Sequence, residues 1–255
     1  MENENKTTKL IQTGAEIVGA VIAGAIGLIG GPVFAIGGNI AGVAVSKGIG
    51  EFAERILSNR EQVRVGASAG LTIVGVQENL DNGLVLRQDG FFDSDEINRS
   101  KAEELFEGVL MKCKNEFEEK KIKFISNIYK NVAFDSSVNP DNANQILNVV
   151  QQLSYRQLTI LAMVGQNISN KYSLRINDFR EDYDNVTTDI EFLLQDFILL
   201  DRQGLICRND ETTLLDISDV VPGIMKLTQI GTDYFKLLDL NFMDEREFNF
   251  IDQIK

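Results

Sequence analysis

Few side chains in this sequence are of the types that carry out catalysis. It contains no histidine, which removes the usual general base, the Ser/His and Cys/His nucleophile pairs, and most zinc and non-haem iron sites. The two cysteines, Cys113 and Cys207, form no CxxC pair, and each lies in an apolar local pattern. We interpret them as small buried apolar side chains in a reducing compartment, with a reactive thiol as the alternative.

Two pairs of aspartates could bind a hard cation, because carboxylate oxygens are the ligands that such cations prefer. They are Asp93 with Asp95 and Asp182 with Asp184. Both pairs lie in expected loops, and neither comes with a further set of ligands. The sequence therefore predicts no metal site, no cofactor and no enzymatic activity.

The chain is strongly acidic, and its charge is unevenly distributed. Its 25 Lys and Arg against 38 Asp and Glu give a net charge of −13, and residues 91–255 carry 18 of the basic and 29 of the acidic groups. Phosphate backbones repel such a surface, so we expect no binding to nucleic acid. An anionic membrane repels it too, so any membrane contact must be hydrophobic and come from the N-terminal third.

The stretch GAVIAGAIGLIGGPVFAIGGNIAGVAVSKGIG, residues 19–50, has a composition unlike the rest of the chain. No charged residue lies between Glu16 and Lys47. Small residues recur at every fourth position, which places them on one helix face and lets a second backbone approach closely. We therefore predict a glycine-zipper helical hairpin whose membrane and oligomer interface contains Gly19, Gly24, Gly27, Gly31, Gly38 and Gly42.

Three interpretations of this stretch compete. A phosphate-binding loop lacks support, because no GxxxxGK[ST] pattern occurs and no lysine lies near GAIGLIGG. A buried glycine-rich hairpin in a soluble core is the second interpretation. Membrane insertion is favoured, since the 30 residues from Ile17 to Ser46 suffice for one span of about 20 residues. With a break at Pro32, the block is either one kinked span or a short hairpin that deepens when helices such as 51–80 join it.

Between this stretch and residue 90 we expect one long helix and a linker. Apolar residues follow a helical period over 51–80. The turn DNG at 81–83 ends the helix, because these residues tolerate the positive φ that follows a helix end. The small-residue pattern continues on this helix, at Gly66, Gly70 and Gly75.

Ser100 and Glu103 have the spacing of a capping box, which predicts that a helix begins at residue 101. We expect it to run to residue 121, with an apolar face formed by Leu105, Val109, Cys113 and Phe117. The alternating charges of NEFEEKKIK, residues 115–123, predict a solvent-exposed face. Another helix is expected over about 122–134.

The C-terminal part has a different order of elements. Helices are expected after Pro140 and Ser154, then a helix capped by Thr187 or Thr188, a strand at Leu205–Cys207, a second strand in GIMKLT and a helix in TQIGTDYFKLLDLN. The order helix, strand, loop, strand, helix resembles the winged-helix fold. In a DNA-binding winged helix, the helix at residues 188–199 would contact the DNA. Here it contains Asp189, Glu191 and Asp196 and no basic side chain. We therefore expect this domain to dock a protein instead of DNA.

The sequence therefore predicts a mainly α-helical protein with four parts. A membrane-active glycine-zipper segment occupies residues 1–50, and a long helix with a linker occupies 51–90. A helical domain follows over 91–170. The last part, over 171–255, is a winged-helix-like α+β domain.

Four stretches of the chain form a recognisable set: RQDGFF at 87–92, residues 99–128, NVAFD at 131–135 and LSYRQLTIL at 153–161. Together they resemble a family of prokaryotic anti-phage proteins, the ring-interacting proteins that sense the phage portal and assemble into membrane pores. The resemblance implies a defence role, a homo-oligomer, damage to a membrane, and a phage structural protein as partner. It also implies a protein that is cytoplasmic when inactive and at the inner membrane when active.

Tyr155 and Arg156 in LSYRQL have two interpretations. They are either first-turn residues that fix one helix on another, or part of a sensing surface. The function itself also has an alternative to the pore-forming effector. A non-enzymatic adaptor or regulator would bind another protein through its winged-helix-like domain, and its glycine hairpin would only dimerise.

Overall fold

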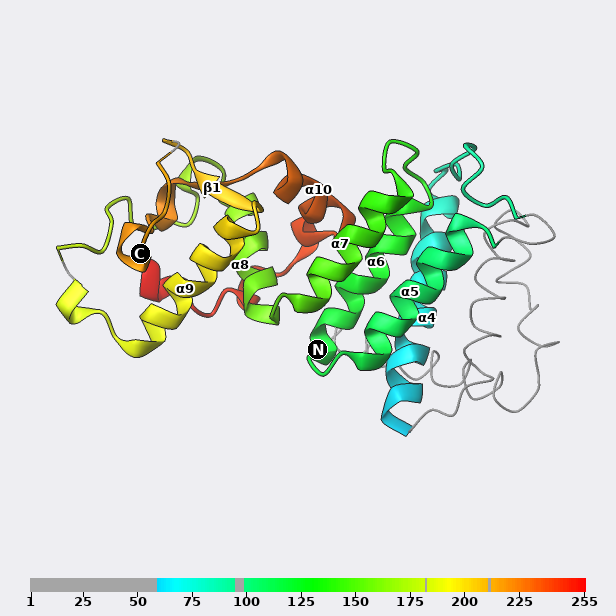
Figure 1. Cartoon of the computed structure of the whole chain (residues 1–255), viewed down its shortest axis with the longest axis horizontal. Coiled ribbons are helices and arrows are strands. Elements are labelled where there is room, and N and C mark those ends of the chain that lie inside the picture. Colours follow the sequence, from blue (N-terminus) through cyan, green and yellow to red (C-terminus); the bar gives the residue numbers. More distant parts are fainter. Residues whose placement is uncertain (1–58, 95–98, 182, 211) are drawn as a thin grey trace. The chain divides into compact units, whose positions relative to one another are not determined.

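The computed structural model describes residues 59–94, 99–181, 183–210 and 212–255 (Figure 1). This part of the chain is mainly helical, with seven α-helices and a two-stranded antiparallel sheet, which confirms the predicted mainly helical class. The predicted glycine-zipper hairpin and its six interface glycines lie outside the described residues. The chain divides after Gln152 into two compact units.

Four helices build the first unit: α4 (Asn59–Asp81), α5 (Lys101–Asn115), α6 (Ile122–Val132) and α7 (Pro140–Gln152). The antiparallel pair α5 and α6 is central, because α4 and α7 each contact both of its members. Ion pairs of Arg60 with Glu119 and of Glu61 with Lys114 place the start of α4 beside the turn between α5 and α6. Helix α4 therefore runs parallel to α6 and antiparallel to α5.

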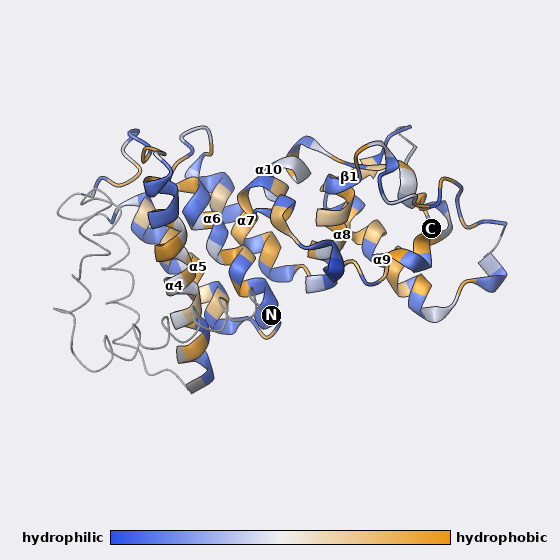
Figure 2. Cartoon of the chain, turned by 180° about the vertical axis from the view of Figure 1, so that it is seen from behind, coloured by the Kyte–Doolittle hydropathy of each residue, from blue (hydrophilic) through white to orange (hydrophobic). Residues whose placement is uncertain are grey.

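Large apolar side chains from α5, α6 and α7 fill the core of this unit, and Figure 2 shows the hydrophobic stripes of these helices. Phe106 of α5 meets Tyr129 of α6 edge to face, with ring centroids 5.1 Å apart. Each fully buried side chain of this size stabilises the fold by about 1.5–3 kcal/mol. The buried residues include Leu105, Phe106, Val109, Leu110, Ile125, Ile128, Tyr129, Val132, Leu147 and Val150.

The predicted C-terminal end of α4 and the predicted start of α5 are both confirmed. Helix α4 ends at Asp81, and Gly83 follows with a φ of +84°, as the DNG turn requires. Helix α5 begins with the capping box, in which the Ser100 hydroxyl accepts from the backbone N–H of Glu103 and the Glu103 side chain accepts from the backbone N–H of Ser100. Residues 51–58 of the first predicted helix lie outside the described residues.

The predicted continuation of α5 to residue 121 is wrong. The helix ends at Asn115, and Phe117, which we placed on its apolar face, is 81% exposed. Glu116 leaves the helical conformation because its carboxylate turns inward to Lys121, with a Oε2–Nζ distance of 2.6 Å. Both side chains are buried, so the solvent-exposed face predicted for residues 115–123 is also wrong at these two positions.

The second unit contains α8 (Tyr155–Gln166), α9 (Thr188–Arg202), β1 (Ile206–Arg208), β2 (Met225–Leu227) and α10 (Gln229–Leu237). Thr187 caps α9, and the two strands pair antiparallel in the register Ile206 with Leu227. Helix α8, which the sequence analysis grouped with residues 91–170, contacts α9, β2 and α10 and belongs to this unit.

The start of α10 explains the glycine in the LTQIG sequence. Thr228 caps the helix: its hydroxyl accepts from the backbone N–H of Gly231 and donates to the carbonyl of Gly204. This brings the first turn of α10 onto the chain just before β1. A Cβ atom on Gly231 would lie 1.8 Å from the carbonyl oxygen of Leu205, so only glycine fits without a backbone shift.

Replacing Gly231 by Ala should therefore destabilise the second unit by about 3 kcal/mol, since the new methyl group meets backbone rather than a flexible side chain. Urea unfolding of the full chain followed by circular dichroism measures the loss, and hydrogen exchange locates it within residues 153–255. Gln229→Ala, an exposed change in the same turn, is the control. Equal stabilities of the two variants would contradict the close approach.

Candidate functional site

Of the site residues predicted from the sequence, the structure describes Tyr155 and Arg156. Both lie in the first turn of α8. A capping box starts this helix, because Ser154 accepts from the backbone N–H of Gln157 and the Gln157 side chain accepts from the backbone N–H of Ser154. The cap fixes the direction in which the two neighbouring side chains leave the helix.

Arg156 reaches across to α9 and binds Asp196. Its Nε lies 2.5 Å from the Asp196 carboxylate, and its Nη2 donates to the Phe192 carbonyl over 3.3 Å. The second carboxylate oxygen accepts from Gln157 Nε2 over 2.8 Å. Asp196 is 6% exposed, so this network satisfies a buried charge and joins α8 to α9.

In the sequence analysis, Asp196 is named only as one of three acidic residues over 188–199 and is not identified as buried. Asp196 lies on the buried face, three residues after Leu193 and four before Leu200, both buried. This helical spacing was the signal that could have found it. The partner 40 residues earlier in the chain could not be identified from local sequence.

Tyr155 is tied to the C-terminal segment of the same unit. Its phenol is half-buried and interacts with the Glu247 carboxylate. Burial first, and then the hydrogen bond and charge of Glu247, raise the pKa of Tyr155 well above its usual range. The phenol therefore stays neutral at physiological pH and can donate to Glu247. Tyr155 and Arg156 therefore both make contacts within the second unit, to Glu247 and Asp196. Their role in sensing a partner stays a prediction.

An exposed apolar surface lies next to this network on α9. Phe192 is 60% exposed and Leu199 is 38% exposed. They are seven residues apart and therefore on one face of the helix. With the Arg156 side chain, itself 46% exposed, they form what we call the α8–α9 surface. An aromatic ring beside a guanidinium group is suited to contact with another protein.

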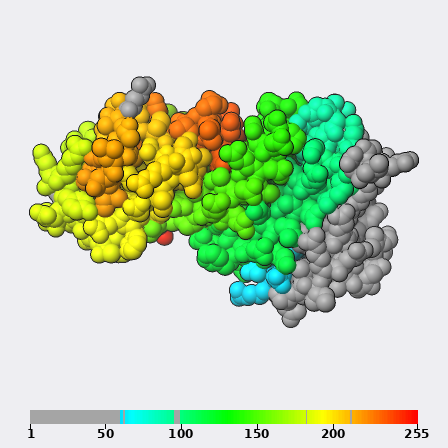
Figure 3. All heavy atoms as spheres, in the orientation of Figure 1, coloured from blue at the N-terminus to red at the C-terminus, as the bar shows by residue number. Residues whose placement is uncertain are grey.

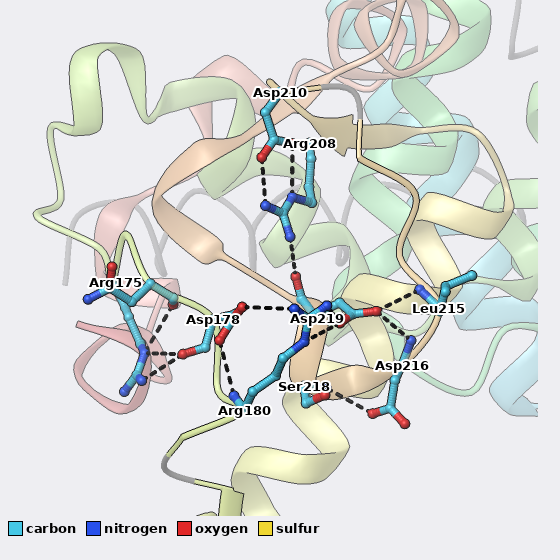
Figure 4. Close-up of polar contacts among 10 residues, drawn as sticks. Arg175, Asp178, Arg180, Arg208, Asp210, Leu215, Asp216, Ser218 and Asp219 are labelled. Atoms are coloured by element: carbon cyan, nitrogen blue, oxygen red, sulfur yellow. Dashed lines mark hydrogen bonds and ion pairs between the residues drawn. The ribbon is translucent and has the colours of Figure 1, made fainter.

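A second polar network holds the connection between β1 and β2 (Figure 4). The Asp219 carboxylate accepts from Arg180 and, over 3.0 and 3.1 Å, from the backbone N–H groups of Leu215 and Asp216. Arg208 of β1 donates to the Asp219 carbonyl over 2.8 Å. Residues 217–219 of this connection contact α9, and the space-filling view shows the orange connection against the yellow helix (Figure 3).

The pKa of Asp219 is lowered by this environment. Burial acts to raise it, but the hydrogen bonds from Arg180 and from two backbone N–H groups, with the charge of Arg180, outweigh burial. The carboxylate is therefore a structural anion at neutral pH. Sequence reasoning missed Asp219, because its partner Arg180 is 39 residues away.

In each network the buried carboxylate, Asp196 or Asp219, is matched by a guanidinium group. Within the described residues, no group of three or more cysteines, aspartates or glutamates could hold a metal ion. The two aspartate pairs considered in the sequence analysis are not tested, because Asp95 and Asp182 lie outside that part of the chain.

Among the helices of the described residues, none combines the length and the apolar character needed to cross a bilayer. The comparisons add no relative: no family model, no curated protein and no solved structure matches this chain.

Removing the guanidinium group with Arg156→Ala should destabilise the second unit by about 1–2 kcal/mol, because Asp196 then keeps only Gln157 as a side-chain partner. Arg156→Leu combined with Asp196→Leu should recover most of the loss, since no buried charge is left behind. Urea unfolding of the three proteins measures this. A fully stable Arg156→Ala variant would argue that the ion pair has no structural role.

Asp219 should also make stability depend on pH. Its folded-state pKa lies below the unfolded value of about 3.9, so its contribution is complete above about pH 4 and is lost as the pH falls through the folded-state pKa. Asp219→Asn should therefore be less stable than the wild type at pH 7 and lose less stability between about pH 4 and pH 2. Thermal unfolding across this range tests the difference, with the exposed Asp233→Asn as the control.

Proposed function

We propose that this protein is a non-enzymatic effector that self-assembles and permeabilises a membrane through its glycine-rich segment. The observation that carries the proposal is the 30-residue stretch from Ile17 to Ser46 without a charged residue, in a chain of net charge −13. The two described units support it, because their cores are filled by their own side chains. The glycine-rich segment is thus available for another purpose.

The cost of the glycines is what favours assembly over simple anchoring. Each interior glycine weakens a helix by about 1 kcal/mol relative to alanine, and an apolar anchor would be better made of leucine. Small residues at every fourth position allow close contact between helices in a membrane. We therefore assign Gly19, Gly24, Gly27, Gly31, Gly38 and Gly42 to contacts between copies of the chain.

The second unit is, in this proposal, the module that receives the signal. It would act as a winged-helix-like docking domain through the α8–α9 surface of Arg156, Phe192 and Leu199. The exposed Asp189 and the partly exposed Glu191 on α9 oppose a nucleic-acid ligand, so we infer that the partner is a protein. The resemblance to the ring-interacting anti-phage family suggests a phage structural protein, a resting form in the cytoplasm and an active form at the inner membrane.

The α8–α9 surface also favours a second candidate. An adaptor or regulator would use the same exposed Phe192 to bind a protein partner, and its glycine hairpin would only dimerise. The two candidates differ in what happens to the membrane. An adaptor leaves the membrane potential of expressing cells unchanged, whereas an effector moves to the membrane and depolarises it.

The double variant Gly27→Leu with Gly31→Leu should separate insertion from assembly. It should enter membranes at least as well as the wild type, because its hydrophobicity rises, yet form no large oligomer and release no ions, because the small face is filled. Membrane fractionation, cross-linked oligomer size and membrane potential in expressing cells measure the three properties.

A matched control for this variant is Ile22→Leu with Ile26→Leu, which keeps the small residues and should retain ion release. Undiminished ion release by the double leucine variant at Gly27 and Gly31 would remove the glycine contacts from the mechanism. Failure of the wild type to depolarise cells under any inducing condition, phage infection included, would favour the adaptor.

A further inference from the structure

Helix α4 is held in the first unit by small and polar side chains. Its large buried apolar side chains are Val65, Ile73 and Val76. The other buried residues are Gly66, Ala67, Ser68, Ala69, Gly70, Thr72 and Gly75. Helix α7 instead seals the same α5–α6 pair with Ile146, Leu147 and Val150. Each helix thus buries three large apolar side chains, but α4 spreads them over 23 residues and places glycine, alanine and hydroxyl side chains between them.

The contact between α4 and α6 has polar groups at its centre. The hydroxyl oxygens of Ser68 and Ser126 lie 2.9 Å apart and are fully buried, and the Ser126 hydroxyl donates to the Ile122 carbonyl. One turn further along, Gly75 lies against the aliphatic stem of Lys130. Such a contact can part without exposing a large apolar area at this point.

Unpartnered polar atoms are found on both helices of this contact. In the part of the chain that the structure describes, three buried side-chain atoms lack a hydrogen-bond partner: Arg64 Nε, Thr72 Oγ1 and the Tyr129 hydroxyl. Arg64 and Thr72 belong to α4, and Tyr129 belongs to α6. Each such atom costs about 1–3 kcal/mol while it is buried without a partner, and separation of α4 would let water reach it.

The chain after α4 is fastened independently of α4. Arg87 is 6% exposed, and its backbone N–H donates to the Ala133 carbonyl. Its guanidinium donates to the carbonyls of Val132, the last residue of α6, and of Val138 in the loop before α7. Between Gly83 and this anchor, Leu84 and Val85 are exposed. The anchor would therefore stay in place if α4 moved away.

We propose that α4 is a detachable helix, which separates from α5 and α6 as one piece while the α5–α6–α7 core stays folded and Arg87 remains the fixed point. The proposal extends the proposed function. The released helix would carry an uncharged stretch, residues 65–77, next to the membrane-active segment. Its resting position is held by the buried Val65, Ile73 and Val76 and by the ion pairs of Arg60 and Glu61. The open form is therefore a minor population until a signal favours it.

Cys113 is a built-in reporter of this opening. It lies on α5, is fully buried, and is hydrogen-bonded to Ser68 of α4 and Ser126 of α6. Burial raises the pKa of its thiol to about 12, so the closed form cannot react with a thiol reagent. Departure of α4 uncovers it.

The test is the rate at which Ellman's reagent labels Cys113 in the full chain carrying Cys207→Ser. The matched control places a thiol between α7 and α5, as Val150→Cys in a chain carrying Cys113→Ser and Cys207→Ser. We expect labelling of Cys113 to be more than about tenfold faster than that of the control thiol, and less sensitive to urea, because only local opening is needed. Equal rates with equal urea dependence would overturn the proposal.

Thr72→Val shows whether the opening belongs to α4. The change keeps the shape of the side chain and removes an unpartnered buried hydroxyl, so it should slow labelling of Cys113 by about fivefold. An unchanged rate would mean that Cys113 is uncovered by some other motion and would overturn the assignment to α4. The control thiol on α7 reports any change in global stability.

A disulfide then links the opening to function. Ser68→Cys, with the native Cys113, should tie α4 to α5 after oxidation by diamide, whereas Ser126→Cys should tie α6 to α5 and leave α4 free, both with Cys207→Ser. With the oxidised Ser68→Cys variant we expect no dye leakage from phosphatidylethanolamine–phosphatidylglycerol vesicles until dithiothreitol is added. With the oxidised Ser126→Cys variant we expect leakage both before and after dithiothreitol. Full leakage caused by the oxidised Ser68→Cys variant would overturn the proposal that α4 must be released before the protein permeabilises a membrane. Absence of leakage from every protein would instead contradict the proposed function, and labelling of Cys113 would still decide whether α4 detaches.

Discussion

The buried ion pair between Glu116 and Lys121 determines how the first unit is assembled. Both side chains are 2% exposed, and the Lys121 ammonium also donates to the Gln151 carbonyl at the end of α7. Removing one partner would leave an uncompensated buried charge, a loss of about 3–5 kcal/mol. The pair ends α5 at Asn115 and reverses the chain before α6 begins at Ile122. Every other helix of the unit packs against the antiparallel pair that results.

The two helices on that pair are attached by different chemistry. Helix α7 inserts Leu147 against Gly108 of α5 and adds a hydrogen bond from Lys112 to Gln151, 2.6 Å long. Helix α4 offers hydroxyl groups and glycines to the same pair. Large side chains filling the hollow over a glycine give a close-packed contact, whereas buried hydroxyl groups contribute little net stability. The pair is thus covered by large apolar side chains on the α7 side, and on the α4 side by Val65, Ile73 and Val76 with glycines and hydroxyl groups between them.

Local features of this fold could be predicted from the sequence, and distant pairings could not. The capping boxes at Ser100 and Ser154 are visible because each partner lies three residues away. The pairs of Arg156 with Asp196 and of Arg180 with Asp219 join residues 40 and 39 positions apart, for which no periodic pattern exists. The predicted exposure of Glu116 and Lys121 was wrong because it rested on their alternating charges, which usually lie on an exposed face. The surrounding helices bury both side chains, and their positions could not be predicted from local sequence.

The acidic charge and the membrane-active segment place opposite demands on this chain. An anionic bilayer repels an acidic unit within about one Debye length, about 8 Å at physiological ionic strength. With α4 docked, the ion pair of Arg60 with Glu119 keeps the start of the helix beside the turn after α5. Helix α4 has 23 residues, which span about 35 Å at 1.5 Å per residue. In the proposed open form, a released α4 is long enough to keep the acidic chain that follows it, residues 91–255 with 18 basic and 29 acidic groups, several Debye lengths from the bilayer. At that distance the repulsion is screened and the hydrophobic segment can insert.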